Sequence, residues 1–425
     1  MNPRRLSVIR LVWAHLWSRP GVTALNGLLL TLGFAAITLV LLVSEQAEHQ
    51  FRKDLAGVDL VVGAKGSPLQ LILSGIYHLD SPTGNIPATA ADQLRAHPLV
   101  AQVVPLALGD SAQGFRIVGT TPDYLQLHQA RLAAGQWRAQ ALQAVIGADV
   151  ARRTGWRVGQ RFEGSHGLGG GGPTHGDHPF TVAGVLAPTG GVIDRLILTP
   201  VESVWQVHDV HHAPAPAEAQ ADDHDHDHAH HPSHDDEKTA PQPPRELTML
   251  LVRYRSPLAA ALLPRWVNSQ GPLQAASPAQ ESVRLLGLVG VGIQVLQGFG
   301  AVLLFVAALS VFVALSHAVR DRQPELAMMR LLGASPRRVS ATVAAEALTL
   351  AAIGVLAGML LGHGLTHLLG HLLDGQASLR LTGLWWSPLE AWLPLVGLGL
   401  GGLACLGPTW LAYRTSMLPA LQGHH

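Results

Sequence analysis

The sequence predicts an α-helical membrane protein with four transmembrane helices in a one-plus-three arrangement, and a large α+β extracytoplasmic domain between the first and second helices. Three observations lead to this fold class. Only 14% of the residues are charged and 48% are hydrophobic, whereas a soluble domain carries about 25% charged residues. Four long apolar runs are present, and a long polar segment separates the first from the other three. Arginines gather in the short segments that should face the cytoplasm, as the positive-inside rule requires.

The N-terminal segment predicts a surface helix followed by a membrane span. Residues 1–20 combine apolar residues at helical spacing with four arginines, which is typical of an amphipathic helix on the cytoplasmic membrane surface. Residues 21–43 contain no charged residue and are long enough to cross the bilayer. This run exceeds the apolar core of a cleavable signal and no A-x-A site follows it. We therefore expect a retained first transmembrane helix with its N-terminus inside.

Residues 44–284 are predicted to form the extracytoplasmic domain. Its first residues, EQAEHQFRKDL, predict a continuation of the first helix. Segments 101–119, 144–147 and 179–198 are rich in Val, Ile and Leu and are broken by Gly and Pro, so they predict strands. Ala148–Thr154 predicts a short helix. Because helices and strands occur in mixed order, the domain should be of the α+β class.

One part of this domain, residues 207–244, differs in composition from the rest. It is poor in apolar residues and rich in Pro, Ala, Asp and His, which predicts a disordered insert. Nine of the 23 histidines lie here, interleaved with aspartates. Neutral imidazole and carboxylate suit Zn²⁺, and also Cu²⁺ and Ni²⁺. The predicted metal ligands are His224, His226, His228, His230, His231 and His234. The alternative is a solvated linker with incidental metal affinity; no cofactor is expected to be required.

The C-terminal part predicts three more spans. Residues 285–319 carry no acidic or basic side chain apart from histidine, and as a helix they would extend about 50 Å, beyond the ~30 Å hydrocarbon core. We expect the first half to project outward as a stalk and the second half to lie in lipid. The remaining predicted segments are a cytoplasmic coupling loop, the third span, an external turn, the fourth span and a cytoplasmic tail, at 320–339, 340–373, 374–388, 389–413 and 414–425.

The loop at 320–339 is basic and carries residues that typically begin and end a short helix. Pro324 suits a first helical position and Gly333 a helix stop. Leu326, Met329 and Leu332 fall on one apolar face, and an amphipathic helix outside the bilayer needs a partner groove. The predicted contact residues are Glu325, Leu326, Met329, Leu332 and Gly333. The alternative is a hairpin that only fixes topology.

Other candidate sites are weaker. His363, His367 and His371 are spaced four apart and share a helix face near the outer interface. They predict either a metal or proton relay face or simple interfacial packing. The sequence contains no P-loop, G-x-S-x-G or H-E-x-x-H motif and a single cysteine. Zero net charge argues against a nucleic-acid partner.

Taken together, these features resemble the MacB/FtsX-like ABC transporter permeases, which include lipoprotein-release and cell-division permeases. The resemblance is strongest at ELAMMRLLGAS (residues 325–335), at residues 59–87 and at GVLAPTGGVIDRLILT (residues 184–199). It implies that residues 324–332 form a coupling helix that contacts a separate ATPase, in a permease homodimer. The chain departs from the MacB drug pump because it has no fused nucleotide-binding domain, and from other members by its histidine-rich insert.

The resulting functional hypothesis is a non-enzymatic permease subunit of an ABC complex in a bacterial inner membrane, with its large domain in the periplasm. The insert suggests a link to zinc or another divalent metal. Three alternatives stay open: extraction of lipoproteins or lipids, ATP-driven regulation of a periplasmic enzyme, and a metal sensor or buffer. The expected partners are an ABC ATPase, a second permease copy, the lipid bilayer, and a periplasmic metal-binding protein or lipoprotein.

Overall fold

The computed structural model describes residues 12–14, 17–18, 20–55, 57–167, 178–209, 245–321, 328, 330–331, 333, 335–373 and 380–414. The chain forms two compact units. The first, which we call the helical unit, consists of Met1–Gln50 and Leu286–His425. The second, the strand-rich unit, is Phe51–Leu285. The strand-rich unit is therefore one continuous segment between the two parts of the helical unit.

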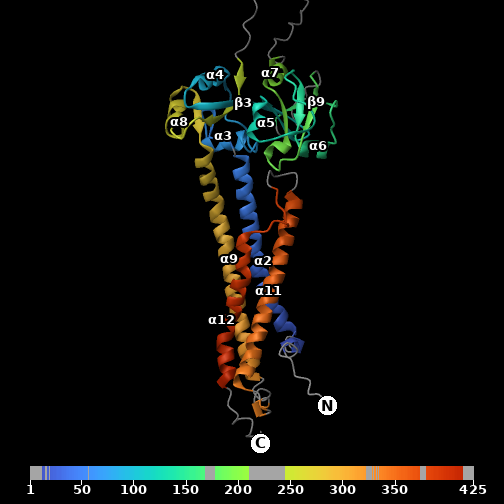
Figure 1. Cartoon of the computed structure of the whole chain (residues 1–425), viewed down its shortest axis with the longest axis vertical. Coiled ribbons are helices and arrows are strands. Elements are labelled where there is room, and N and C mark those ends of the chain that lie inside the picture. Colours follow the sequence, from blue (N-terminus) through green and yellow to red (C-terminus); the bar gives the residue numbers. More distant parts are fainter. Residues whose placement is uncertain are drawn as a thin grey trace, which may run out of the picture. The chain divides into compact units, whose positions relative to one another are not determined.

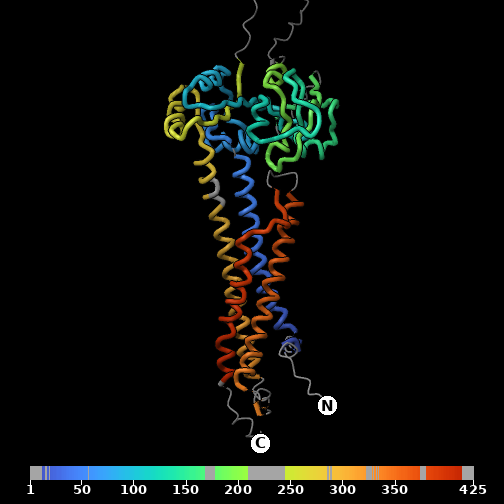
Figure 2. The backbone as a smooth tube through the Cα atoms, viewed as in Figure 1, coloured from blue at the N-terminus to red at the C-terminus, as the bar shows by residue number. Residues whose placement is uncertain are grey.

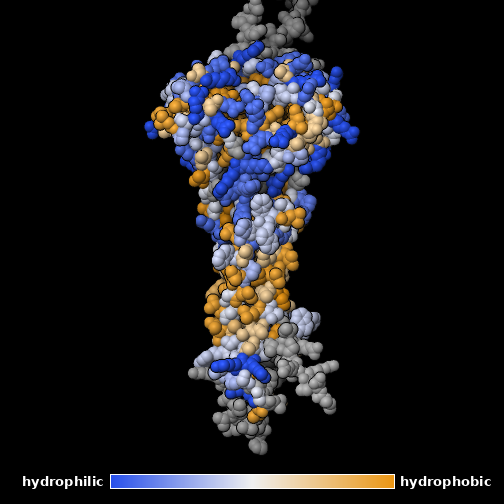
Figure 3. Space-filling view, in the orientation of Figure 1, coloured by the Kyte–Doolittle hydropathy of each residue, from blue (hydrophilic) through white to orange (hydrophobic). Residues whose placement is uncertain are grey.

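The helical unit is built on four helices that are long and apolar enough to cross a membrane (Figure 1). They are α2 (Pro20–Asp54), α9 (Pro278–Asp321), α11 (Pro336–Leu373) and α12 (Trp392–Arg414), and the 3-10 helix η3 (Pro388–Ala391) precedes α12. Large apolar side chains such as Phe299, Leu360 and Leu395 lie exposed along them. Figure 3 shows hydrophobic residues over this part of the surface. Exposed apolar surface of this extent is typical of helices that face lipid or a partner, and it fits the membrane protein that the sequence predicts.

Helices α2 and α11 approach each other along a stripe of glycines. Gly354, Gly358 and Gly362 are spaced four apart, so they lie on one face of α11. A Cβ added at Gly358 would lie 2.5 Å from Phe34 Cβ and 2.8 Å from the carbonyl oxygen of Thr31. Small residues at this spacing let membrane helices pack with their backbones close. Figure 2 shows α2 and α11 side by side, although they are distant in sequence.

Helix α9 is longer than the charge-free run that predicts it. The sequence predicts its start at residue 285, but α9 begins at Pro278. Proline suits this position because its missing N–H would have no partner in a first turn. Glu281 and Arg284 lie in the opening turns, with 3.6 Å between Oε2 and Nη1. Charged residues are tolerated in the opening turns of a helix. Glu281 and Arg284 therefore limit the apolar run, whereas the helix itself begins earlier, at Pro278.

The strand-rich unit alternates short strands and helices. Its strands are β1 (Leu60–Ala64), β2 (Ile86–Pro87), β3 (Val100–Ala112), β4 (Phe115–Thr120), β5 (Leu132–Gly135), β6 (Gln143–Ile146), β7 (Arg161–Phe162), β8 (Ser165–His166), β9 (Phe180–Leu186), β10 (Leu196–Pro200), β11 (Glu246–Leu247), β12 (Met249–Tyr254) and β13 (Leu273–Ala276). Its helices are α3 (Pro68–Gly75), α4 (Thr89–Ala96), α5 (Asp123–Leu127), α6 (Ala148–Thr154), η1 (Val192–Arg195), α7 (Val201–Asp209) and α8 (Ala259–Ser269).

Most strands join one mixed sheet in the order β13-β1-β12-β3-β4-β10-β6-β9-β5. The pairs β10–β4 and β6–β9 are parallel, and the other pairs along this path are antiparallel. The long strand β3 pairs with β12 over its first part and with β4 over its second. Buried clusters of Val, Leu and Ile lie on the sheet faces. This mixture of parallel and antiparallel strands with short helices is an α+β arrangement, as the sequence predicts.

The turn between β9 and β10 is organised by two buried carboxylates. Asp194 accepts hydrogen bonds from Thr189 N (2.9 Å), Thr189 Oγ1 (2.7 Å) and Gly190 N (2.8 Å). Asp54, at the end of α2, accepts a hydrogen bond from Val192 N (2.9 Å). Gly190 has a φ of +73°, a conformation that glycine adopts without strain. The turn thus has a defined conformation that depends on both acids.

Candidate metal centre

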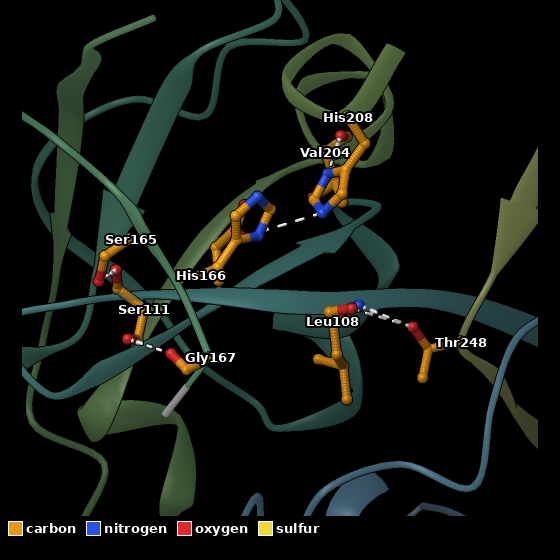
Figure 4. Close-up of polar contacts among 9 residues, drawn as sticks. Leu108, Ser111, Ser165, His166, Gly167, Val204, His208 and Thr248 are labelled. Atoms are coloured by element: carbon orange, nitrogen blue, oxygen red, sulfur yellow. Dashed lines mark hydrogen bonds and ion pairs between the residues drawn. The ribbon is translucent and has the colours of Figure 1, made fainter. Parts of the chain in front are cut away.

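Three side chains of metal-ligand type converge in the strand-rich unit, and Figure 4 labels two of them, His166 and His208. Asp110 comes from β3, His166 from β8 and His208 from the last turn of α7. One ligand atom of each lies within 4.8 Å of those of the other two. Within the described part of the chain, no other group of three or more His, Cys, Asp or Glu residues meets this distance. The three residues are far apart in sequence, so the fold alone brings them together.

Strand pairing holds two of the three ligands in place. β8 runs antiparallel to β3, with Asp110 opposite His166 and Ser111 opposite Ser165. Residues directly opposite in an antiparallel pair project from the same face of the sheet. Ser111 Oγ donates to Gly167 O at 2.5 Å and Ser165 Oγ donates to Ser111 O at 3.2 Å, which secures the short strand. His166 Nδ1 lies 3.0 Å from Asp110 Oδ1 as a result.

Helix α7 supplies the third ligand with its tautomer defined. His208 Nδ1 lies 2.8 Å from the carbonyl oxygen of Val204. A carbonyl oxygen only accepts, so Nδ1 must carry the hydrogen that it donates. In the neutral ring this leaves the lone pair on Nε2, which lies 3.9 Å from Asp110 Oδ1. Metal-binding histidines commonly donate their other ring N–H to a backbone carbonyl in this way.

The site combines a buried acid with accessible imidazoles. The Asp110 side chain is 2% exposed, while those of His166 and His208 are 32% and 38% exposed. The two rings lie with their centroids 5.2 Å apart, and Figure 4 shows them pointing toward each other. Two imidazoles and a carboxylate suit zinc, with bond lengths of about 2.0–2.2 Å. A metal ion at that bond length from all three ligand atoms would draw the three side chains slightly closer together. The fourth coordination position of the ion would stay open.

The metal ligands predicted in the insert, His224, His226, His228, His230, His231 and His234, lie outside the described residues. The predicted start of the insert at residue 207 is wrong, however, because α7 extends through Asp209. Val201, Val204 and Val207 are buried and form an apolar stripe that continues the helix into the insert. His208, counted by sequence with the histidine-rich tract, is therefore an ordered helix residue.

Of the predicted ATPase-contact residues, Glu325, Leu326, Met329 and Leu332 lie outside the described residues. Gly333 has a φ of +96° and donates from its N–H to Arg330 O at 3.1 Å. This left-handed conformation is the one expected of a helix-ending glycine. Met328 and Leu331 are 63% and 54% exposed, so apolar side chains are accessible next to the predicted face.

The histidine face on α11 is divided between two sets of contacts. His363 Nδ1 lies 2.7 Å from Gly383 O, and its Nε2 lies 3.2 Å from Oε2 of the fully buried Glu390. His367 Nε2 lies 3.3 Å from His371 Nε2. In the described helices these residues thus form two pairs and not one three-ligand group. The contacts of His363 secure the segment before α12 to α11, which agrees with the packing alternative.

The convergence of Asp110 and His166 was not predicted from the sequence. In sequence, His166 stands at the edge of a glycine-rich stretch that shows no strand pattern, and the structure places it on β8. One signal was available: Asp110 interrupts the strand-like run at 101–119, and an acid in such a run often has a partner. The partner itself depends on strand pairing that no local spacing reveals.

Comparison with known families identifies the class of this protein. The model of the MacB-like periplasmic core domain matches residues 23–226, and the model of the FtsX-like permease C-terminal domain matches residues 298–417. The two matches cover most of the chain in the order that the sequence resemblance implies. The chain therefore belongs to the MacB/FtsX-like family of ABC transporter permeases. The resemblance drawn from the coupling loop and the two domain segments is confirmed.

Solved structures of two periplasmic or extracellular regions are similar to part of the chain. The periplasmic region of MacB from Actinobacillus actinomycetemcomitans is 10% identical, with a TM-score of 0.33, over 54% of this chain and 95% of that one. The extracellular domain of the noncanonic ABC-type transporter YknZ from Gram-positive bacteria is 11% identical, with a TM-score of 0.30, over 52% and 99%. No curated protein matches the sequence significantly. Because both scores are low, the assignment rests on the two family matches.

Proposed function

We propose that this chain is the permease subunit of an ABC complex in a bacterial inner membrane, and that a separate ATPase chain drives it as a permease homodimer. The observation that carries this proposal is the FtsX-like match over residues 298–417, which includes the loop between α9 and α11. The 425 residues contain no P-loop motif. ATP hydrolysis would therefore take place on a partner.

The proposed topology places both termini and the α9–α11 loop in the cytoplasm and the strand-rich unit outside. Arginine distribution supports this orientation, since basic loops stay inside. Helices α2 and α9 each contribute residues to both units.

Docking of the ATPase on the loop is tested by copurification. Leu326→Asp with Met329→Asp places charges on the predicted apolar face, and Met328→Asp with Leu331→Asp charges the neighbouring exposed positions. We expect the first pair to abolish copurification of the ATPase, with the permease dimer intact by crosslinking. Retention of the ATPase by both double variants would refute the coupling assignment. Loss only in the second pair would move the contact to the face of Met328 and Leu331.

A second function, divalent metal handling, is favoured by the histidine-rich insert and by the cluster of Asp110, His166 and His208. We propose zinc as the metal, because imidazole and carboxylate are ligands that it prefers. A strain that produces the protein without residues 211–241 should grow more slowly than wild type under zinc limitation and normally in replete medium. Equal growth of both strains in both media would remove metal handling and leave lipoprotein extraction or enzyme regulation as the task of the permease.

A further inference from the structure

We infer that Asp110, His166 and His208 form a preformed divalent-metal site, best suited to Zn²⁺, that is separate from the histidine-rich insert. Its purpose rests on the metal-handling role proposed above, but its ligand set does not. Two imidazole nitrogens and one carboxylate oxygen supply three ligands, and a water molecule or a ligand from a partner would complete a tetrahedral zinc.

The first argument is the electrostatics of His208 and Asp110. Since His208 Nδ1 donates to Val204 O, Nε2 of the neutral ring directs a lone pair toward the Asp110 carboxylate, 3.9 Å away. A metal ion placed between the two groups could accept this lone pair and bind the carboxylate as well. The second imidazole, His166, lies 3.0 Å from the same carboxylate oxygen, which favours a metal ion that all three can bind.

The second argument is preorganisation. The pairing of β8 with β3 fixes Asp110 opposite His166, and the packing of α7 on β3 and β4 positions His208. Little conformational entropy would be lost on binding, whereas ligands spread along a flexible insert must be gathered at an entropy cost. The three-residue site should therefore fill before the insert does.

The third argument is access. A buried carboxylate beneath two partly exposed imidazoles gives the ion a route from solvent. Gly109 also leaves room beside the ring, because a Cβ at this position would lie 3.4 Å from His208 Nε2. A larger side chain there should displace the ring without removing a ligand. Helix α7 ends at Asp209, so the site directly precedes the histidine-rich insert in sequence.

The test uses the membrane protein with only residues 211–241 removed, reconstituted in lipid nanodiscs and titrated with Zn²⁺ in competition with a chromophoric chelator. We expect one tight zinc per chain. The double variant His166→Gln with His208→Gln should weaken zinc binding by about 100-fold or more. Loss of a residue that only orients a metal ligand already lowers metal affinity by about 10- to 100-fold. Asp110→Asn and Gly109→Val should each weaken zinc binding as well. His97→Gln, which removes a histidine that packs on Trp266, is the matched control and should leave binding unchanged.

Co²⁺ provides a readout that does not depend on affinity. The chain with the three ligands should show the intense visible absorption of tetrahedral Co²⁺, and the double glutamine variant should not. Equal zinc stoichiometry and affinity in the double variant and in the parent would overturn the site, provided that ATPase copurification shows both to be folded. ATPase copurification without zinc binding would refute the site and keep the permease. Zinc binding without any growth effect of the double variant would keep the site and refute its part in metal handling.

Discussion

The helical unit and the strand-rich unit of this chain differ in where they place their large apolar side chains. The helices expose large apolar side chains such as Phe305 and Leu356, and they carry few ionisable groups in their central parts. The strand-rich unit buries its Val, Leu and Ile in several clusters. In lipid, apolar side chains on the outside of a helix bundle carry no free-energy penalty, so the hydrophobic effect does not drive the helices together. Which helices pack against each other must therefore be decided by the contacts between them.

Glycine supplies that specificity in the helical unit, and buried polar groups supply it in the strand-rich unit. Gly358 lets α11 approach the backbone of α2, and Gly401 lies against Ala351 between α12 and α11. In the strand-rich unit, Asp194 and Asp54 define a turn through directed hydrogen bonds. The comparison teaches that close packing at glycines orders the helix contacts of the first unit, with buried polar contacts such as His363 with Glu390 beside it. In the second unit, hydrogen bonds to buried polar groups order the turns and sites.

The largest expected effect is on helix packing. Gly358→Leu would force a side chain against Phe34 Cβ and the carbonyl oxygen of Thr31, both within 3 Å of the new Cβ. We expect a loss of about 3 kcal/mol or more in unfolding free energy, at the upper end of overpacking costs. Gly364→Leu is the control on the same helix, because nothing lies within 4 Å of its Cβ position. Thermal unfolding in nanodiscs measures both, and equal melting temperatures would contradict the close approach of α2 and α11.

The next effect concerns the turn at Asp194. Asp194→Ala would leave the half-buried N–H groups of Thr189 and Gly190 without their carboxylate acceptor. Loss of hydrogen bonds to a charged group should cost about 2–3 kcal/mol. Asp92→Ala removes an exposed carboxylate that pairs with Arg95 at 2.8 Å, and it should cost less than about 1 kcal/mol. Urea unfolding followed by tryptophan fluorescence separates the two cases, and similar midpoints would show that the turn does not depend on Asp194.

A smaller effect depends on pH and belongs to the strand-rich unit. Burial lowers the pKa of His128 to about 4, and burial with the nearby Arg116 charge lowers the pKa of His78 well below its usual value. Histidine in the unfolded chain has a pKa of about 6.5. Between pH 6.5 and 4 the unfolded chain therefore binds protons that the folded chain does not, and the unfolding free energy falls as the pH drops through this window.

For His128 the loss should be on the order of 1–2 kcal/mol between pH 6.5 and 5. Unfolding of wild type and of His128→Gln at a series of pH values provides the measurement. The variant should show a shallower dependence below pH 6.5. An identical slope in both proteins would mean that His128 is not held neutral by its surroundings.

The smallest expected effect is on folding when the insert is removed. Its composition predicts that it cannot contribute to a core, so deletion of residues 211–241 should change the unfolding free energy by less than about 0.5 kcal/mol. A longer deletion, of residues 201–241, also removes α7 with its buried Val204 and Val207. It should lower the unfolding free energy by several kcal/mol. Comparable losses in the two deletions would show that the insert takes part in the fold.

The sequence by itself determined the features that depend on local composition. The four apolar helices follow from hydropathy, because the bilayer sets their length and polarity. The short helix at Ala148–Thr154 has the bounds that the sequence predicts. The family resemblance depended on contiguous motifs in the loop and in two domain segments, and it is confirmed.

Only the tertiary structure decided which distant residues meet. The parallel pairing of β10 with β4 and the opposition of Asp110 to His166 depend on strand register, which is set by the whole sheet and not by any single strand. His208 was grouped with the insert by composition, yet the buried stripe of α7 fixes it beside β3. Local pattern reports what a segment can bury, whereas a site built from three elements exists only where the packing of all three places their side chains together.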